Sequence, residues 1–382
     1  MTAVQGAAAP VTEKVGPDRR GSWLPTPALI STRLMDLRRR RGVMITILVV
    51  VVGLPTVFLG IRLLLHAVDP KSYGPAGGAD VYTQLLAGPM NVFGFIVAAL
   101  LGCTAGSSDL SDGMFRHLVV TGRSRLALYL ARIPAGLAII LSAVAAGFTI
   151  ICLVCTLAAP STVNYNGANV PQGLSLSGFE AWAGAHPDAV FCNFNFAGPP
   201  PTNLNCANGT VVKLGPGGPG PGGNPLTHAQ LKAAAIHVAA NFGNYQSYQT
   251  IFLAPPISLM VGSGLWLELV AIVGFVVGLG LSSLIGQRTV SVILLIVTEI
   301  VLTPILATAR IPYMTNVQRA LVGIATDHLE PNGIVRVFGA GGGPNARMNL
   351  LPEQTYVAVL VVIAWLVVWT ALGAWRMMTR DA

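Results

Sequence analysis

The stretch SLMVGSGLWLELVAIVGFVVGLGLSSLIGQRTVSVILLIVTEIVLTPILATA, residues 258–309, holds two long apolar runs separated by Gln287-Arg288. Each run is long enough to cross a bilayer as a helix, the form in which a segment satisfies its own backbone hydrogen bonds. Because only two residues join the runs, we expect the two helices to be neighbours. Four further runs have almost no charge, at about 43–65, 86–107, 133–157 and 355–376.

The composition of the 382-residue chain agrees with a membrane protein. Hydrophobic residues make up 53% and charged residues 10%, whereas a soluble domain has roughly 45–50% and 25%. The sequence therefore predicts an all-α polytopic membrane protein with six transmembrane helices. Its predicted parts are a tail with an interfacial helix at 1–42, three spans at 43–157, a large external loop at 158–257, and three spans with an external segment 310–354 at 258–382.

The basic residues orient the chain. Fifteen Lys and Arg lie in segments 1–42, 109–132, 287–288 and 376–382, and seven lie in the longer segments 66–85, 158–257 and 310–354. The positive-inside rule places the first group, and with it both termini, in the cytoplasm. This orientation accounts for the net charge of +8. Because no base-stacking aromatic residues accompany the basic ones, we expect no nucleic-acid partner.

The segment before the first span, ALISTRLMDLRRRRG (28–42), predicts an amphipathic helix. Ile30, Leu34 and Leu37 follow a helical spacing, and Arg33 and the run Arg38 to Arg41 are available for lipid phosphates. Such a helix would lie in the inner interface of the membrane. The alternative interpretation is a flexible tail that ends in a stop-transfer cluster of charges.

The loop 158–257 has contents of its own. A helix is expected at 228–242, and Cys192 and Cys206 lie where thiols can oxidise. We therefore predict a disulfide between Cys192 and Cys206, which would stabilise the loop by about 3 kcal/mol. The other three cysteines lie inside apolar spans, where we expect them to serve packing, and the six histidines show no metal-ligand spacing, so no metal site is predicted.

The charged segment DLSDGMFRHLVVTGRSRLALYLAR (109–132) separates the second and third spans. Leu110, Met114 and Leu118 form a helical stripe, Thr121-Gly122 breaks the helix, and Ser124 can cap the helix that follows. A structured cytoplasmic helix-turn-helix of this kind indicates a docking surface. The alternative is that its arginines only enforce orientation or bind lipid phosphates.

Six spans in this order, with DGMFRHLVVTGRSRLALYLAR before the third, resemble the membrane subunit of ABC-2 type (type V) ABC exporters. The family's pattern of an acidic residue, Gly-Met-x-Arg, a turn and Ser-Arg is matched by Asp112, Gly113, Met114, Arg116, Ser124 and Arg125. IPYMTNVQRALVGI (311–324) resembles the family's external half-helix region, and ALGAWRMMTRDA (371–382) its usual ending. The chain departs from the family in the length of loop 158–257.

The resemblance implies a permease in a bacterial plasma membrane, and the 19 Arg against four Lys look like a GC-rich, actinobacterial-like source. Two identical or related permease subunits would form a path for an amphiphile, a drug or a lipid-like molecule. A separate ATPase subunit would bind ATP and Mg²⁺, because this chain has no phosphate-binding loop and no catalytic residues are predicted. The implied docking residues are Asp112, Met114, Phe115, Arg116, His117, Arg123 and Arg125.

Two carboxylates lie inside predicted spans. Glu268 and Glu299 are candidates for the substrate path, because a carboxylate at membrane depth is costly. They are neighbours in the predicted hairpin and could approach one another. A structural role in helix packing, or a snorkelling Glu268, is the alternative. An ion-coupled secondary transporter, or a membrane-embedded enzyme with an external active site, are the other function classes left open.

Overall fold

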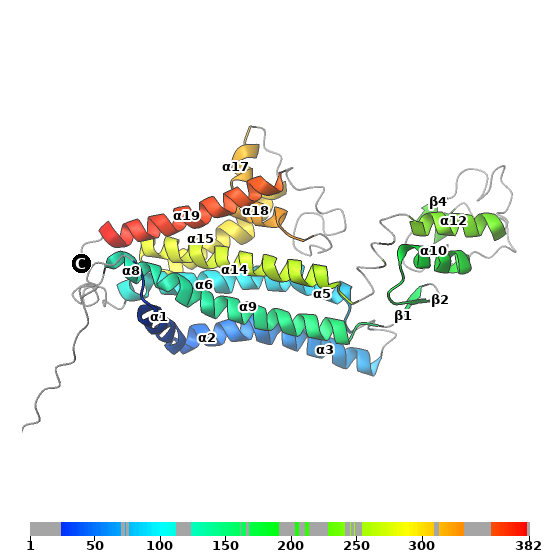
Figure 1. The fold of residues 1–382 in the computed structure, drawn as a ribbon, viewed down its shortest axis with the longest axis horizontal. Coiled ribbons are helices and arrows are strands. Elements are labelled where there is room, and N and C mark those ends of the chain that lie inside the picture. The colour runs from blue at the N-terminus through cyan, green and yellow to red at the C-terminus, as the bar shows by residue number, and fades with distance from the viewer. Residues whose placement is uncertain are drawn as a thin grey trace, which may run out of the picture.

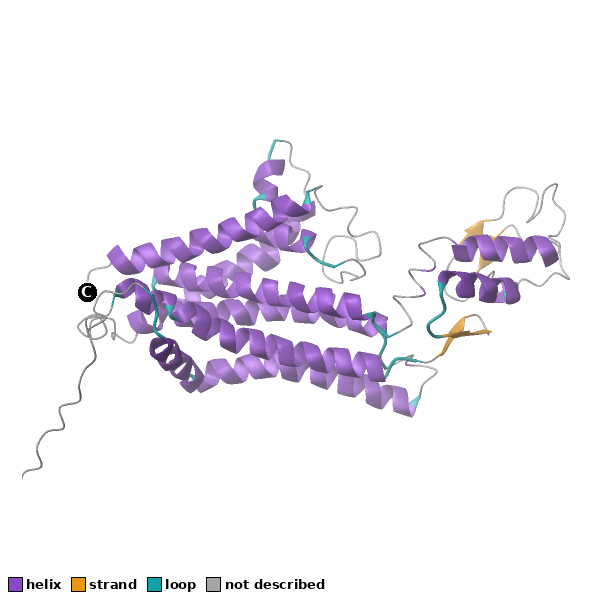
Figure 2. Cartoon of the chain, in the orientation of Figure 1, coloured by secondary structure: helices purple, strands orange, loops and turns teal. Residues whose placement is uncertain are grey.

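The computed structural model describes residues 24–69, 73, 76–111, 124–160, 162–165, 168–190, 203–205, 211–213, 228–240, 245, 248, 254–308, 313–331 and 353–379. This part of the chain is mostly helical (Figures 1 and 2). Within these described ranges, four helical segments are long and apolar enough to cross a membrane: Arg41–Val68, Arg125–Leu157, Ile257–Ile285 and Thr355–Thr379. The predicted helical class is confirmed, and the apolar helices fit a membrane-embedded protein.

Helices occupy each of the six segments for which the sequence predicts a span. In chain order these are α2 (Arg41–Ile47), η1 (Leu48–Gly53) and α3 (Leu54–Val68); α5 (Ala79–Leu85), η2 (Leu86–Met90) and α6 (Asn91–Ser111); α8 (Arg125–Leu130) and α9 (Arg132–Leu157); α14 (Ile257–Ile285); α15 (Arg288–Ile296), η3 (Val297–Leu302) and α16 (Thr303–Thr308); and α19 (Thr355–Thr379). The second segment supplies only a shorter apolar helix, Asn91–Ser107.

The three π-helices η1, η2 and η3 accompany prolines. Pro55 follows η1 near the start of α3, Pro89 lies within η2, and Pro304 follows η3 near the start of α16. Proline lacks an N–H group and its ring clashes with the carbonyl four residues earlier, so a widened turn lets the helix continue through it. The third of these turns contains Glu299.

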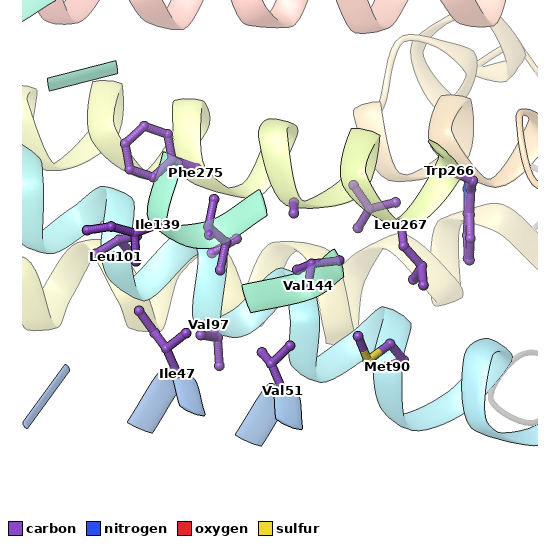
Figure 3. Close-up of a cluster of buried hydrophobic side chains, with 14 of the residues drawn as sticks. Ile47, Val51, Met90, Val97, Leu101, Ile139, Val144, Trp266, Leu267 and Phe275 are labelled. Atoms are coloured by element: carbon purple, nitrogen blue, oxygen red, sulfur yellow. The ribbon is translucent and has the colours of Figure 1, made fainter. Parts of the chain in front are cut away.

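Helix α14 is the centre of the bundle. In its apolar 18-residue stretch 72% is buried inside the structure, whereas the matching share is 22–28% in the other three long helices. It packs against α6, α9 and α19. A layer of apolar side chains from several of these helices fills the space between them (Figure 3). The labelled residues of that layer are Ile47, Val51, Met90, Val97, Leu101, Ile139, Val144, Trp266, Leu267 and Phe275.

Glycines bring the backbones of α6 and α14 into contact. A Cβ at Gly278 would lie 2.7 Å from the Ala99 carbonyl oxygen, and a Cβ at Gly102 would collide with the Phe275 carbonyl oxygen. Both helices carry a Gly-x-x-x-Gly pattern, 102–106 and 274–278, which is typical of close helix packing in membranes. The two helices run in the same direction, because Phe95 contacts Gly274 and Gly106 contacts Leu279.

The N-terminal helix α1 (Pro27–Arg39) is present, and it packs on the elbow between α8 and α9 (Figure 1). Leu29 joins a small core with Ala127, Leu128 and Ala131. Arg33 departs from the prediction, because it is buried and lies 3.8 Å from Asp36 instead of facing lipid. It stands four residues from Leu29 and from Leu37, on the helix face that the elbow covers.

The predicted external loop contains an ordered module at the end of the bundle opposite to α1 and α8 (Figure 1). It comprises the antiparallel pair β1 (Thr162–Tyr165) and β2 (Ala168–Pro171), the helices α10 (Leu176–Ala185), α11 (Pro187–Val190) and α12 (His228–Ala240), and the antiparallel pair β3 (Asn203–Asn205) and β4 (Val211–Lys213). The expected helix at 228–242 is therefore present as α12. Cys192 and Cys206 lie outside the described residues.

Aromatic side chains form the core of this module. The rings of Phe179 and Tyr248 stack with their centroids 4.6 Å apart. The Tyr248 hydroxyl donates to the Pro171 carbonyl at 2.6 Å, and the Trp182 indole donates to the Asn169 carbonyl at 3.1 Å. Both bonds tie the helical part of the module to strand β2, so each buried aromatic polar group is satisfied.

The contact between α6 and α14 predicts unequal effects of two alanine substitutions in one helix. Gly102→Ala is expected to cost about 1–3 kcal/mol, because its Cβ meets the backbone of α14, which cannot rotate away. Gly94→Ala is the matched control, since a Cβ there has no neighbour within 4 Å. Thermal unfolding of the purified proteins in detergent measures both. Equal melting temperatures for the two variants would contradict the close backbone contact.

Candidate functional site

Glu299 lies in the π-helix η3, where a threonine one turn later contacts its carboxylate. The Thr303 hydroxyl oxygen is 3.1 Å from Glu299 Oε2 and 3.0 Å from the Thr298 carbonyl oxygen. The glutamate is half-buried. A hydroxyl on the same helix therefore provides part of the polar environment that a carboxylate needs at this depth.

A short helix covers Glu299. Helices α17 (Thr315–Arg319) and α18 (Val322–His328) follow α16, within the region where the sequence indicates half-helices. Gly323 of α18 lies directly against the carboxylate, since a Cβ at this position would collide with Glu299 Oε2 and would lie 2.6 Å from the Thr303 methyl group. The glycine thus allows the backbone of α18 to rest on the polar pair.

Three hydrogen bonds hold α17 and α18 in place. The Gln318 amide donates to the Leu306 carbonyl of α16 at 2.9 Å. The Trp266 indole of α14 donates to the Thr326 carbonyl at 2.9 Å, and the Trp365 indole of α19 donates to the Ala320 carbonyl at 2.8 Å. The helix pair is therefore attached to three different helices of the bundle, and the position of Glu299 beneath it depends on all three.

A histidine and a glutamate form the outer part of this cluster. His328 Nδ1 lies 3.0 Å from the Ile324 carbonyl oxygen and 3.6 Å from Glu353 Oε2. A carbonyl oxygen only accepts, so Nδ1 carries a proton. The Glu353 side chain is 1% exposed and stands just before α19. Burial raises the pKa of Glu353 above its ordinary value, while the nearby His328 and Arg319 side chains oppose the shift.

The structure does not join the two predicted carboxylates. Among the described residues, Glu268 makes no hydrogen bond or ion pair with Glu299, whose contacts are Thr303 and Gly323. The reason lies in the geometry of α14. Trp266 is the residue that points toward α18, and two positions along an α-helix correspond to a rotation of roughly 200°. Glu268 therefore faces away from the Glu299 cluster.

The predicted docking residues fall mostly outside the described part of the chain. Asp112, Met114, Phe115, Arg116, His117 and Arg123 lie there. Helix α6 continues to Ser111, so residues 109–111 belong to α6 rather than begin a separate helix. Ser124 caps α8 as predicted, with its hydroxyl accepting from the Ala127 amide at 3.2 Å. Arg125 donates to the Met378 carbonyl near the end of α19 at 3.2 Å.

A second arginine in this region has a role that the sequence did not indicate. Arg132 is 2% exposed, and its guanidinium donates to the Gly106 carbonyl of α6 at 3.2 Å. The pair Arg125 and Arg132 thus connects the α8–α9 elbow to both α19 and α6. Charge alone does not separate such an arginine from one that serves orientation, because the distinction depends on which carbonyl lies within reach.

Comparison of the chain with protein-family models and with characterised proteins finds no match.

The buried carboxyl of Glu353 predicts a pH-dependent effect on stability. Because the pKa of Glu353 is raised in the folded state, its carboxyl contributes stability that is fully present below pH 4.5. This contribution is lost as the pH rises and the buried carboxyl ionises. Glu353→Gln should therefore melt at a higher temperature than the parent protein above neutral pH, and at the same temperature below pH 4.5. Thermal unfolding across this range measures the difference. Glu180→Gln on α10 is the control for the change in overall charge.

A lower melting temperature for Glu353→Gln at neutral pH would contradict this account. It would mean that the attraction of the ionised carboxylate to His328 and Arg319 outweighs the cost of burying it.

Proposed function

We propose that this chain is the membrane subunit of an ATP-driven ABC-2 type exporter, with six transmembrane helices in a bacterial plasma membrane. The observation that carries the proposal is the packing of α1 on α8, the helix that directly follows the motif shared with this family. Leu29 of α1 contacts the same small core as Ala127 and Leu128 of α8. Helices α1 and α8 therefore form one packed unit, here called the docking unit, directly after the predicted docking segment in the chain.

This unit is suited to passing motion into the membrane helices. Its elbow is bonded to α19 through Arg125 and to α6 through Arg132. Helix α6 in turn contacts α14 backbone to backbone at Gly102. Closely packed backbones cannot be compressed much, so a displacement of the docking segment moves the helices as a group. ATP binding and hydrolysis on a separate ATPase subunit would supply that displacement.

The arrangement of the basic elements supports a cytoplasmic location for the docking unit. Helix α1 and helix α8 lie at one end of the bundle together with the end of α19, and the module that contains β1, β2, α10 and α12 lies beyond the other end (Figure 1). The corner between α1 and α2, which holds Arg38 to Arg41, belongs to the first end. Under the positive-inside rule this end faces the cytoplasm and the module faces outward.

Glu299 is the residue that we assign to the cargo path. It lies beneath α18, whose position is set by α14, α16 and α19. Movement of these helices would change how far α18 covers the carboxylate. A second permease subunit, identical or related, would complete the path, as in other exporters of this class.

Substitution of the docking arginines tests the proposal. Arg116→Ala combined with Arg123→Ala should leave membrane insertion intact, because Arg38 to Arg41 still dominate the orientation. Loss of a charge-assisted hydrogen bond at a subunit contact weakens association by about 1.5–3 kcal/mol, roughly 10- to 100-fold. Copurification of the ATPase after mild detergent extraction and efflux from cells should therefore fall together.

Glu299→Gln provides the matched control for that experiment. It should leave ATPase copurification unchanged and alter efflux alone, because Glu299 contacts Gly323 of α18 and Thr303 and is not part of the docking unit. Full ATPase association and efflux in the double arginine variant would contradict the docking role. A protein that transports without any ATPase would favour an ion-coupled transporter instead.

The proposed orientation predicts opposite labelling at two exposed positions. In a protein with Cys192→Ser and Cys206→Ser, the variant Ala181→Cys on α10 should react with a membrane-impermeant maleimide in intact cells. Met35 on α1 is 59% exposed, and the variant Met35→Cys should react only after the membrane is opened. Labelling of Met35→Cys in intact cells would show that the orientation is wrong.

A further inference from the structure

A cavity of about 330 Å³ lies where three separate segments meet. The corner between α1 and α2 contributes Arg40, and the turn between α14 and α15 contributes Gln287, Arg288 and Thr289. Thr104 and Ser107 of α6 form its floor and are almost inaccessible from outside, with 1% and 3% exposure. Arg40 and Arg288 bring two positive charges to the described part of the lining.

The turn between α14 and α15 adds backbone donors to this positive charge. Gly286 ends α14 with a left-handed φ of 77°, and its N–H donates to the Ser282 carbonyl at 2.8 Å. Gln287 then precedes α15 as its N-cap residue, and its side chain makes no capping hydrogen bond. The positive end of α15, a helix of nine residues, thus lies beside Arg288 at the edge of the cavity.

The floor of the cavity has the opposite hydrogen-bonding character. The Thr104 hydroxyl donates to the Leu100 carbonyl at 2.7 Å, and the Ser107 hydroxyl donates to the Cys103 carbonyl at 2.8 Å. Their protons are used within α6, so their oxygens are left to accept. A complementary ligand has an anionic group for the arginines and hydroxyl donors for the floor.

The surroundings of the cavity suit the chains of a lipid. Ile45 of α2 and Leu48 of η1 are exposed beyond Arg40, and Val290 and Ile293 of α15 are exposed beyond Arg288. Along both helical segments, a basic residue is therefore followed within two turns by exposed apolar side chains. This is the pattern expected where a phosphate lies at the membrane border and acyl chains lie along the helices.

We propose that this cavity binds the headgroup of an anionic phospholipid whose phosphodiester carries a polyol, of the phosphatidylglycerol type. The phosphate contacts Arg40 and Arg288, and the polyol hydroxyls donate to Thr104 and Ser107. A zwitterionic headgroup fits less well, because its ammonium group would stand beside two guanidinium groups. The site is independent of the transport function proposed above, since it rests on the cavity alone.

Native mass spectrometry of the purified full-length chain tests the site, with phosphatidylglycerol, phosphatidylcholine and inorganic phosphate as separate probes. The parent protein should bind phosphatidylglycerol more tightly than phosphatidylcholine. Arg288→Gln should weaken phosphatidylglycerol binding about 10- to 100-fold, as loss of a charge-assisted hydrogen bond implies. Arg39→Gln removes the same charge next to Arg40 but outside the cavity, and it should change binding less than about twofold.

The floor is tested by phosphatidylmethanol, an anionic phosphodiester lipid without hydroxyl donors. The parent protein should prefer phosphatidylglycerol to phosphatidylmethanol, and Thr104→Val combined with Ser107→Ala should abolish this preference while the protein remains folded. Equal losses in Arg288→Gln and Arg39→Gln would overturn the site in favour of diffuse surface charge. Binding of inorganic phosphate without lipid would overturn the lipid assignment. So would an Arg288→Gln effect on ATPase copurification alone.

Discussion

The backbone contact between α6 and α14 is the constraint on which the rest of the structure depends. In a membrane, lipid tails are as apolar as leucine, so helices associate through close packing rather than through the removal of apolar surface from water. Gly102 and Gly278 allow carbonyl oxygens of the facing helix to approach where any side chain would collide. With α14 held in this way, α9 and α19 have a fixed surface on which to pack.

Polar groups inside this frame are arranged by the same helices. Indole groups of α14 and α19 reach carbonyls of α17 and α18, so two packing helices also position the cover over Glu299. The π-helix η3 places that carboxylate beside Thr303. At the other end, Arg125 and Arg132 reach carbonyls of α19 and α6. Each end of the bundle therefore has polar contacts that depend on how the same central helices pack.

Several elements could be predicted because their signals are local. Helical segments follow from runs of apolar residues that exceed the length of a bilayer, and the cap at Ser124 follows from its place before an apolar helix. The Gly-x-x-x-Gly patterns of α6 and α14 are equally local, and they carried a packing signal that the prediction did not use. The prediction that Arg33 is available for lipid phosphates is wrong, because the side chain is buried. Its burial depends on the α8–α9 elbow, which is almost 100 residues away in the chain.

The sequence by itself determined the helical class, the positions of the apolar segments and the presence of an acidic residue within two of them. Only the tertiary structure decided that Glu299 lies beneath α18 while Glu268 faces elsewhere, and that Arg40, Ser107 and Arg288 share one cavity. The physical reason is that hydropathy and helix propensity act along the chain, whereas these placements depend on the rotation of each helix about its axis. That rotation is set by packing against partners distant in sequence.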